Sequence, residues 1–325
     1  MRRAIVASSL LCAALGSACI TVNLPTAGEG ELEEAVVAGE SGPKILMIAV
    51  AGALSTQPDS GSFGLGGRES QTARLREEVE LALEDDEIAA LVLRIDSPGG
   101  TVIASEMLYR EVRRFKEKTG RPVIAQMLGA GTSGAYYVAM AADEVRAYPS
   151  TVTGSIGVII AGINVSGLME RFGVANQTIT TGPFKDAGSP LRPMRPEERA
   201  QLEGVARDLF ASFLDVVQAG RPKLTRARIE ELADGRVYSA SQALATGLID
   251  AVGELPEAVE AAKRAAGIEG DARVVVYHRP GEEPENLFWA RTPALPEAKA
   301  FDWTALPDPA FLYLWAPGAG LPAVQ

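Results

Sequence analysis

A single stretch decides the fold: AALVLRIDSPGG (residues 89–100), in which an apolar run ends in a glycine pair. The apolar run is typical of a strand buried on both faces. A helical pattern follows over residues 104–118, where Leu108, Val112 and Phe115 recur on one face. Strand, turn and helix in this order predict a βα unit, with the glycine pair at the carboxyl end of its strand, where α/β folds place their sites.

The same alternation of strands and helices continues along most of the chain. It predicts an α/β fold with a mainly parallel sheet and right-handed crossovers. Further strands are expected over residues 44–50, 122–127, 144–147, 154–161 and 271–277. Further helices are expected over residues 75–85, 134–142, 196–220, 225–232, 239–247 and 256–266. Residues 55–68 are rich in glycine and serine and predict a loop.

A serine among small residues follows the strand predicted over residues 122–127. It is Ser133, in the run GAGTSGAYY (residues 129–137). Small neighbours leave its hydroxyl uncrowded and let a peptide backbone approach, which suits a nucleophile. Taken alone, a serine among glycines is more often a turn residue, so the assignment depends on a partner that removes its proton.

Two side chains are candidates for that partner. The chain has a single histidine, His278, which lies toward the C-terminus. Lys185, in GPFKDAGS (residues 182–189), acts as a base when burial makes its amine neutral, and Pro183 and Phe184 beside it are apolar. A lysine in such a place is usually a solvated surface cation, so Lys185 also needs support from the rest of the sequence.

Composition excludes several classes of function. The 325-residue chain has a net charge of −11 and no basic stripe, which argues against a nucleic-acid partner. Its length allows one large domain or two small ones. With one histidine, and cysteines only at Cys12 and Cys19, a transition-metal site is not expected, and nothing in the sequence calls for a cofactor.

The N-terminal residues 1–18 are typical of an export signal. Arg2 and Arg3 precede an apolar segment, and small residues lead up to Cys19. This pattern resembles a bacterial lipoprotein signal with lipid on Cys19, and a plain secretory signal cut near Ala18 is the alternative. Residues 19–43 then predict a lipid-anchored linker. The protein is therefore expected to be exported and held at a membrane, in the periplasm or on the outer face.

The C-terminal residues 269–325 have a different character from the rest. They contain many prolines and all three tryptophans, Trp289, Trp303 and Trp315. We interpret them as an extended arm, too apolar to be freely disordered, that packs on the parent domain or on a neighbouring subunit. A role in binding peptides or membranes is the less expected alternative.

Between residue 45 and residue 267 the chain carries an ordered set of motifs: DSPGG (96–100) with ASE (104–106), TSGAYYVA (132–139) with AAD (141–143), TGSIGV (153–158), GPFKD (182–186) with GSP (188–190), and DGRVY (234–238) with Ala243 and GLID (247–250). As a set, these motifs resemble the signal peptide peptidase A family of membrane-associated serine peptidases. The resemblance implies the Clp-protease/crotonase fold, a repeated ββα spiral, for a single catalytic domain over residues 44–268. The Cys19 anchor departs from it, since many members use a transmembrane helix, and so does the aromatic arm.

The resemblance also implies roles for individual residues. Ser133 matches the nucleophile and Lys185 the general base, which takes the serine proton and returns it to the leaving amine. Ser155 matches the position that orients the lysine amine. The backbone amides of Gly100 and Gly134 are expected to form the oxyanion hole. Asp186 is expected to point away from Lys185, because a carboxylate in contact would keep the amine charged.

In short family members the serine and the lysine come from adjacent subunits. This chain has one copy of each motif, so the resemblance implies a homo-oligomeric ring with shared active sites. The implied function is an endopeptidase for hydrophobic peptides such as residual signal peptides, with neither metal nor cofactor.

Three other functions remain as alternatives. A crotonase-type acyl-CoA enzyme shares the fold but does not need Lys185, and an exported protein has little access to CoA. A Ser-His-Asp peptidase needs His278 to reach Ser133. The third alternative is a non-enzymatic function, a catalytically silent, lipid-anchored scaffold that binds peptides. It would not explain the presence of both the serine and the lysine.

Overall fold

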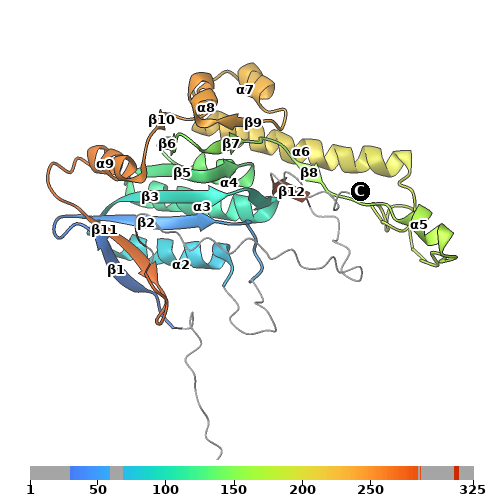
Figure 1. Ribbon diagram of the computed structural model, residues 1–325, viewed down its shortest axis with the longest axis horizontal. Helices are drawn as coiled ribbons and strands as arrows, with labels where there is room; N and C mark the ends of the chain where they lie inside the picture. The colour runs from blue at the N-terminus through green and yellow to red at the C-terminus, as the bar shows by residue number, and fades with distance from the viewer. Residues whose placement is uncertain (1–29, 59–68, 285, 287–310, 315–325) are drawn as a thin grey trace, which may run out of the picture.

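The computed structural model describes residues 30–58, 69–284, 286 and 311–314. Across these residues a nine-stranded sheet has the order β1-β11-β2-β3-β5-β6-β10, with β7 paired to β5 and β9 to β7 (Figure 1). From β11 to β10 every neighbouring pair is parallel. The predicted parallel α/β sheet is therefore confirmed. The strands are β1 (Glu33–Ala38), β2 (Lys44–Ala51), β3 (Ile88–Ser97), β5 (Val123–Thr132), β6 (Glu144–Ala147), β7 (Val152–Gly154), β9 (Val237–Ser239), β10 (Ala251–Val252) and β11 (Arg273–His278).

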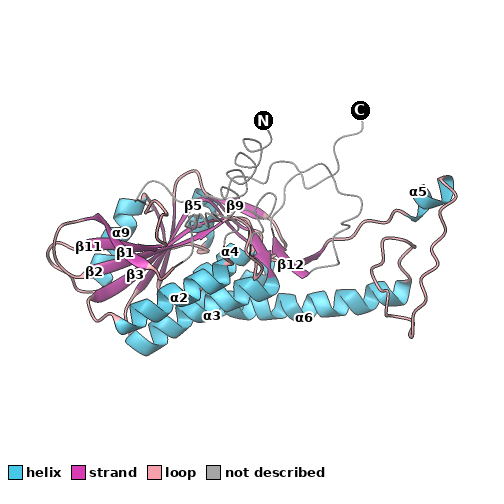
Figure 2. Ribbon diagram, turned by 90° about the horizontal axis from the view of Figure 1, so that it is seen from below, coloured by secondary structure: helices cyan, strands magenta, loops and turns pink. Residues whose placement is uncertain are grey.

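Helices cover both faces of this sheet, which explains why its central strands are apolar throughout. In β2, Leu46 and Ile48 face the side covered by α2 (Gln71–Glu84) and α3 (Val102–Thr119). The alternate residues Ile45 and Met47 face α9 (Leu255–Ala265) on the other side. Figure 2 shows α2 and α3 side by side beneath the sheet. No helix in the described residues is long and apolar enough to cross a bilayer.

A second, small sheet lies beside the first. It has three strands in the order β4-β12-β8 within the described residues, and all its pairings are antiparallel. β4 (Gly99–Thr101) is the glycine pair that ends the deciding stretch, β8 is Ile159–Ile160, and β12 (Phe311–Leu314) belongs to the C-terminal extension. This sheet therefore joins segments that are far apart in the chain.

The start of α3 holds β4 in position. The Thr101 side chain caps the helix by accepting from the N–H of Ala104 at 3.3 Å. The helix ends at Gly120, whose φ of 67° is left-handed and suits glycine. Both ends of α3 are capped, and Leu108, Val112 and Phe115 are buried along one face as expected. The helix therefore supports the glycine pair at its N-terminus.

An arm projects from the body of the molecule. Residues 161–195, with the short helix α5 (Ser166–Arg171), lie at its far end, and the long helix α6 (Pro196–Gly220) leads back to the body (Figures 1 and 2). The helices α7 (Arg226–Leu232) and α8 (Ala240–Thr246) follow α6, and α4 (Gly134–Ala139) lies against the sheet.

The sheet extends beyond both predicted boundaries of the catalytic domain. Residues 33–38, assigned to the linker 19–43, form β1, because their backbone pairs antiparallel with the edge of β11. β11 itself falls in the predicted extension 269–325 yet lies parallel to β2. The strand predicted over 154–161 is two short strands, β7 and β8, in different sheets. The export signal, Cys19 and the three tryptophans lie outside the described residues.

Candidate functional site

Ser133 occupies a sharp, strained turn between β5 and α4. Its φ of 53° and ψ of −117° are rare for a residue with a side chain. The N–H of Ser133 donates to the carbonyl of Gly154 at 2.7 Å, and the residue is only 1% exposed. A strand-to-helix elbow of this kind presents a serine hydroxyl away from its own backbone, as nucleophilic serines require.

Ser155 also has a positive φ. Its φ is 51°, and among the described residues Ser133 and Ser155 are the non-glycine positions with positive φ. The N–H of Ser155 donates to the carbonyl of Arg236 at 2.8 Å, which ties it to the segment before β9. Gly154 joins the two serines, since it precedes one and bonds to the other. Strain of this kind clusters at functional sites, and here it falls on two residues that the sequence singles out.

The backbone amides of Gly100 and Gly134 lie beside one another. The N–H of Leu54 donates to the carbonyl of Gly99 at 2.8 Å, and the carbonyl of Leu54 accepts from the N–H of Thr101 at 2.9 Å. These bonds occupy one side of β4, so the N–H of Gly100 between them faces the opposite side. A β-carbon placed on Gly134 would lie 3.3 Å from the Gly100 nitrogen. Such an arrangement can present two N–H donors to one developing oxyanion.

Side-chain volume is excluded at both glycines. A β-carbon on Gly100 would overlap the backbone of Leu54. One on Gly134 would overlap Oγ of Ser105, which is held by its own hydrogen bond to the carbonyl of Thr101 at 2.9 Å. Glycine is therefore needed at both positions for close packing. The glycine-rich sequence suggests that close packing occurs, but it does not show at which glycines.

Aromatic side chains line the region next to Ser133. The rings of Tyr137 and Phe213 lie 5.1 Å apart, and Tyr109 packs on Tyr137 at 5.3 Å. Burial raises the pKa of Tyr137 to about 12, so its hydroxyl stays neutral. The Tyr136 hydroxyl donates to the carbonyl of Leu248 at 2.7 Å and fixes the first turn of α4. This aromatic cluster was not predicted from the sequence, although Tyr136 and Tyr137 follow Ser133 directly.

Lys185 lies elsewhere, in the exposed loop of the arm. Its side chain forms no hydrogen bond or ion pair with any residue in the described ranges, and the structure does not bring it to Ser133. Pro183 and Phe184 are exposed too, so the expectation that they bury this lysine is wrong for the single chain. The reason is that the arm extends away from the body instead of folding over it (Figure 1).

Asp186, next to Lys185, is held by an arginine that the sequence analysis overlooked. Arg192 donates to it through Nε at 2.8 Å and through a second nitrogen at 2.7 Å. Arg192 also binds the buried carboxylate of Glu198 at the start of α6. The hydrogen bonds from Arg192 lower the pKa values of both carboxyl groups. The sequence signal for this ion-pair cluster is the spacing, since Arg192 lies six residues from each of the two acidic residues.

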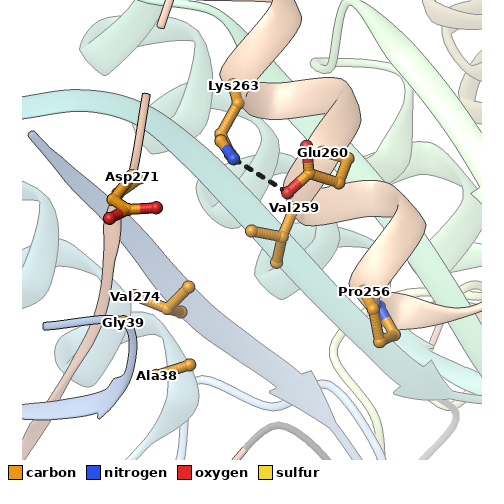
Figure 3. Close-up of a pocket in the computed structure, with 9 residues that line it drawn as sticks. Ala38, Gly39, Pro256, Val259, Glu260, Lys263, Asp271 and Val274 are labelled. Carbon is orange, nitrogen blue, oxygen red and sulfur yellow. Dashed lines mark hydrogen bonds and ion pairs between the residues drawn. The ribbon is translucent and has the colours of Figure 1, made fainter. Parts of the chain in front are cut away.

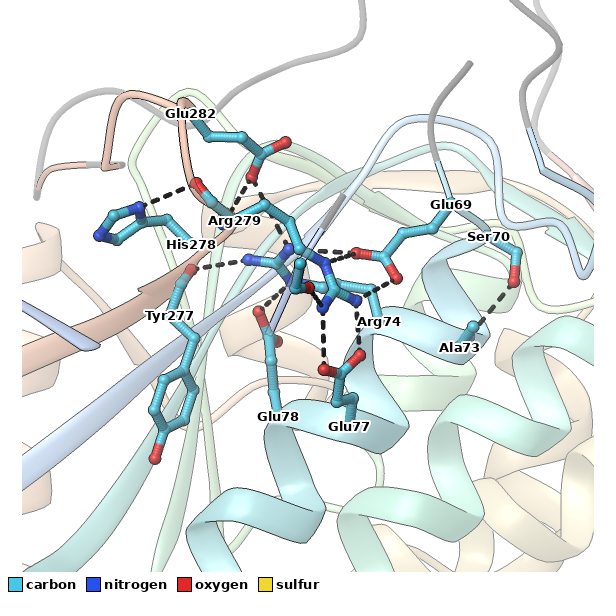
Figure 4. Close-up of polar contacts among 11 residues, drawn as sticks. Glu69, Ser70, Ala73, Arg74, Glu77, Glu78, Tyr277, His278, Arg279 and Glu282 are labelled. Atoms are coloured by element: carbon cyan, nitrogen blue, oxygen red, sulfur yellow. Dashed lines mark hydrogen bonds and ion pairs between the residues drawn. The ribbon is translucent and has the colours of Figure 1, made fainter. Parts of the chain in front are cut away.

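His278 belongs to a separate polar cluster at the end of β11 (Figure 4). Its Nδ1 lies 3.1 Å from the carbonyl oxygen of Arg279. Arg279 binds Glu69 and Glu77 on the other side of that cluster. Strands β2 and β3 separate β11 from β5, and three strand spacings amount to about 14 Å. His278 is therefore out of reach of Ser133, and a Ser-His-Asp site is excluded in this chain.

A surface hollow of about 250 Å³ lies far from these residues, between α9 and the ends of β1 and β11 (Figure 3). Val259 and Val274 line it, and Lys263 at its rim donates to Glu260 at 3.0 Å. It holds no serine or cysteine and is not a candidate active site. Across the described ranges, no group of three or more His, Cys, Asp or Glu is placed to hold a metal ion.

Comparisons with known proteins identify the family. The profile of Peptidase family S49 matches residues 115–269. The Synechocystis protein slr0021 is provisionally named a protease. It is 36% identical to this chain over 228 residues, which cover 70% of this chain and 76% of that protein. An Enterococcus faecium protein provisionally named signal peptide peptidase SppA is 33% identical over 77% of this chain and 72% of its own length. A solved structure, the 1510-N membrane-bound stomatin-specific protease, has a TM-score of 0.44 at 14% identity, covering 68% of this chain and 85% of that one.

Proposed function

Since this chain belongs to Peptidase family S49 and is a serine peptidase with the Clp-protease/crotonase-like α/β fold, we propose that Ser133 is its nucleophile and Lys185 its general base. The strained elbow at Ser133, with the Gly100 and Gly134 amides beside it, is the observation that carries the proposal. Attack by the serine oxygen places negative charge on the substrate carbonyl, next to these amides. Ser155, one residue beyond Gly154, orients the lysine amine.

The separation of Lys185 from Ser133 points to a site shared between subunits. In one chain the base lies on the arm and the nucleophile lies in the body, so a second chain has to supply the missing half. The arm is suited to such a contact, because apolar side chains on it are exposed to solvent: Ile163, Leu168, Phe172, Val174, Ile179, Phe184 and Met194. Packing against a neighbour would cover them and would also desolvate Lys185, which makes the amine a base.

The proposed substrates are hydrophobic peptides such as residual signal peptides, cleaved internally by a homo-oligomeric ring. The aromatic lining around Tyr137 and Phe213 supports an apolar substrate. The proposed location is the periplasm or the outer face of a membrane, with lipid on Cys19 as the anchor. This part of the proposal is supported by the sequence of residues 1–19 alone, and a Cys19→Ala variant that remains in the membrane fraction would contradict it.

The test is hydrolysis of a fluorogenic hydrophobic peptide by the full chain. Ser133→Ala and Lys185→Ala are each expected to lower kcat/KM by at least about 1,000-fold. Lys185→Arg is expected to be as inactive as Lys185→Ala, because a guanidinium keeps the charge but cannot take a proton. Lys223→Ala, which removes an exposed lysine beyond α6, serves as the matched control and should retain full activity.

Mixing distinguishes a shared site from one built within a chain. When the inactive Ser133→Ala and Lys185→Ala chains are combined, some interfaces pair an intact serine with an intact lysine, so activity should return. An inactive mixture would contradict a shared site. Full activity in both single variants would remove the catalytic assignment of Ser133 and Lys185, whereas no hydrolysis by the unmodified chain would leave the peptide-binding scaffold as the reading.

A further inference from the structure

The strand β5 carries a bulge just before Ser133. Up to Ile95 of β3 the two strands pair residue by residue, but from there residues 128–130 of β5 stand opposite Asp96 alone. At the same place β5 leaves β6 as its neighbour and pairs with β7 instead. Bulges bend a strand and re-aim the side chains beyond them, and they are frequent beside active sites.

The carboxylate of Asp96 holds this bulge in place. Its Oδ1 accepts from the N–H of Ala130 at 3.0 Å. Gly129 makes this approach possible, because a β-carbon on it would lie only 3.1 Å from the same oxygen. The carbonyl of Leu128, at the start of the bulge, accepts from the hydroxyl of Thr151. Side chains therefore satisfy polar backbone groups of the bulge.

Asp96 and the residue after it also hold the other segments around the site. The carbonyl of Asp96 accepts from the N–H of Gly52 at 2.9 Å, directly after β2, in the turn whose backbone bonds to β4. The buried hydroxyl of Ser97 accepts from the N–H of Gly99 at 3.1 Å, inside the glycine pair that provides one proposed oxyanion donor. Both sides of the proposed oxyanion hole are therefore fastened to the same two residues, the glycine pair through Ser97 and the loop of Ser133 through Asp96.

We propose that Asp96 is a positioning residue: by holding the bulge in β5, its carboxylate sets the place of Ser133 relative to the two proposed oxyanion amides. This inference rests on the proposed function, because it concerns the same nucleophile and the same donors. The amides act only when the reacting carbonyl lies within hydrogen-bond reach while the serine oxygen attacks it, and a displacement of about 1 Å can cost about 100-fold in rate. Without the carboxylate the N–H of Ala130 has lost its partner, and the backbone that leads to Ser133 shifts to find another.

The test separates kcat from KM in peptide hydrolysis by the full chain. Asp96→Ala should lower kcat about 100-fold and change KM by less than about threefold, because the binding surfaces remain while the reacting groups are misaligned. Asp96→Asn keeps an oxygen acceptor on a side chain of the same size, so it should retain at least about one third of the activity of the unmodified chain. An unchanged kcat in Asp96→Ala would overturn the positioning role, and so would an Asp96→Asn chain as slow as Asp96→Ala.

Asp143→Ala is the matched control. The Asp143 carboxylate accepts from the N–H of Val123 at 2.9 Å, which is the same kind of bond at the opposite end of β5. Its removal should lower the melting temperature, as Asp96→Ala does, but should leave kcat within about twofold of the unmodified chain. A loss of kcat in Asp143→Ala as large as that in Asp96→Ala would reduce both effects to general destabilisation and overturn the proposal.

Gly129→Ala tests the same contact from its other side, and it keeps the proposal testable should Asp96→Ala unfold at the assay temperature. The new β-carbon would lie 3.1 Å from Oδ1, so the carboxylate has to shift away from the N–H of Ala130. We expect kcat to fall about threefold to tenfold. In a chain that already carries Asp96→Ala the change should have no further effect, since both substitutions act through one contact. Equal losses in the two backgrounds, or an unchanged kcat in Gly129→Ala alone, would overturn the proposal.

Hydrogen exchange of the Ala130 amide provides a readout without catalysis. In Asp96→Ala the exchange should be at least about tenfold faster than in the unmodified chain, and in Asp143→Ala it should change by less than about threefold. Unchanged exchange in Asp96→Ala would overturn the proposal, because the carboxylate would then not hold the bulge. Failure of the proposed function would appear differently, as peptide hydrolysis that persists in Ser133→Ala or is absent from the unmodified chain, so the two failures are distinguishable.

Discussion

The body around Ser133 and the arm that carries Lys185 differ in almost every physical respect. Ser133 is buried, its backbone is strained, and neighbouring segments fix it on several sides. Lys185 is exposed, on a loop surrounded by apolar side chains that face solvent. The comparison teaches that one half of the proposed site is complete within the chain and that the other half awaits a partner. Changes in the body should therefore alter folding and catalysis together, whereas changes in the arm should alter assembly and catalysis alone.

Among the changes that test this comparison, the largest effect is expected from Gly134→Ala in the body. The new β-carbon overlaps Oγ of Ser105 and displaces an amide of the proposed oxyanion hole, so kcat/KM should fall about 100-fold or more and the melting temperature should fall with it. Adding Ser105→Ala removes the overlapping oxygen and should recover stability and at least about tenfold of the lost activity. Peptide hydrolysis and thermal melts check both. An unchanged rate in Gly134→Ala would show that this amide takes no part.

The next effect is expected from Phe172→Asp in the arm. Phe172 is 76% exposed, so the free energy of unfolding should change by less than about 0.5 kcal/mol. Assembly and activity should both be lost, the latter by about 100-fold, because a carboxylate opposes burial at a subunit contact. Light scattering and peptide hydrolysis are the measurements. Leu244→Asp, at an exposed apolar position in α8, is the control. A monomer that retains full activity would break the comparison.

A smaller effect is expected from Arg192→Ala, which tests whether the arm prepares its own lysine. The variant frees the Asp186 carboxylate, whose pKa Arg192 keeps low, next to Lys185. A free carboxylate favours the protonated ammonium, so activity at pH 7 should fall about tenfold and recover at alkaline pH. Arg192→Lys keeps the positive charge but not the bidentate geometry, so its activity at pH 7 should lie between those of the unmodified chain and Arg192→Ala. The pH profile of kcat/KM is the measurement, and an unshifted profile would contradict this role.

The smallest effect is expected from Glu69→Gln, in the cluster at the end of β11 and remote from both halves of the site. Burial opposes ionisation of Glu69, but hydrogen bonds from Arg279 and Arg74 outweigh it and lower its pKa. The resulting stabilisation is present above the unfolded pKa and is lost as the pH falls through the folded one. The substitution should therefore lower the melting temperature by about 2 °C at pH 7 and by progressively less as the pH falls through the folded pKa of Glu69, and it should leave activity unchanged.

Most of the sheet could be predicted because its strands are buried on both faces and read as apolar runs. β2, β3, β5 and β6 appear in the sequence for this reason. β1 carries two acidic residues and lies at an edge, so its pattern is that of a linker. β12 could not be predicted as a strand, because β4 and β8, which hold it, lie more than 150 residues earlier in the chain.

The site divides in a similar way. Ser133 could be singled out because small residues in a strand-to-helix turn have a local signature, whereas the roles of Gly100 and Gly134 came from the family resemblance. The placement of Lys185 could not, since it depends on which way the arm extends, and no local pattern encodes that. Tyr313 gave no signal either, because the aromatic cluster that it joins is assembled from α4, α6 and β12 together.

If Ser133 and Lys185 act as proposed, the extended arm keeps a single chain inactive. Such a chain carries a nucleophile that no base activates, so it is silent from the moment it folds. Turnover then follows mass action: the specific activity falls on dilution and rises as chains crowd together. Anchoring through Cys19, as proposed, would confine the chains to two dimensions and raise their local density, so hydrolysis would be confined to the surface where hydrophobic peptides accumulate.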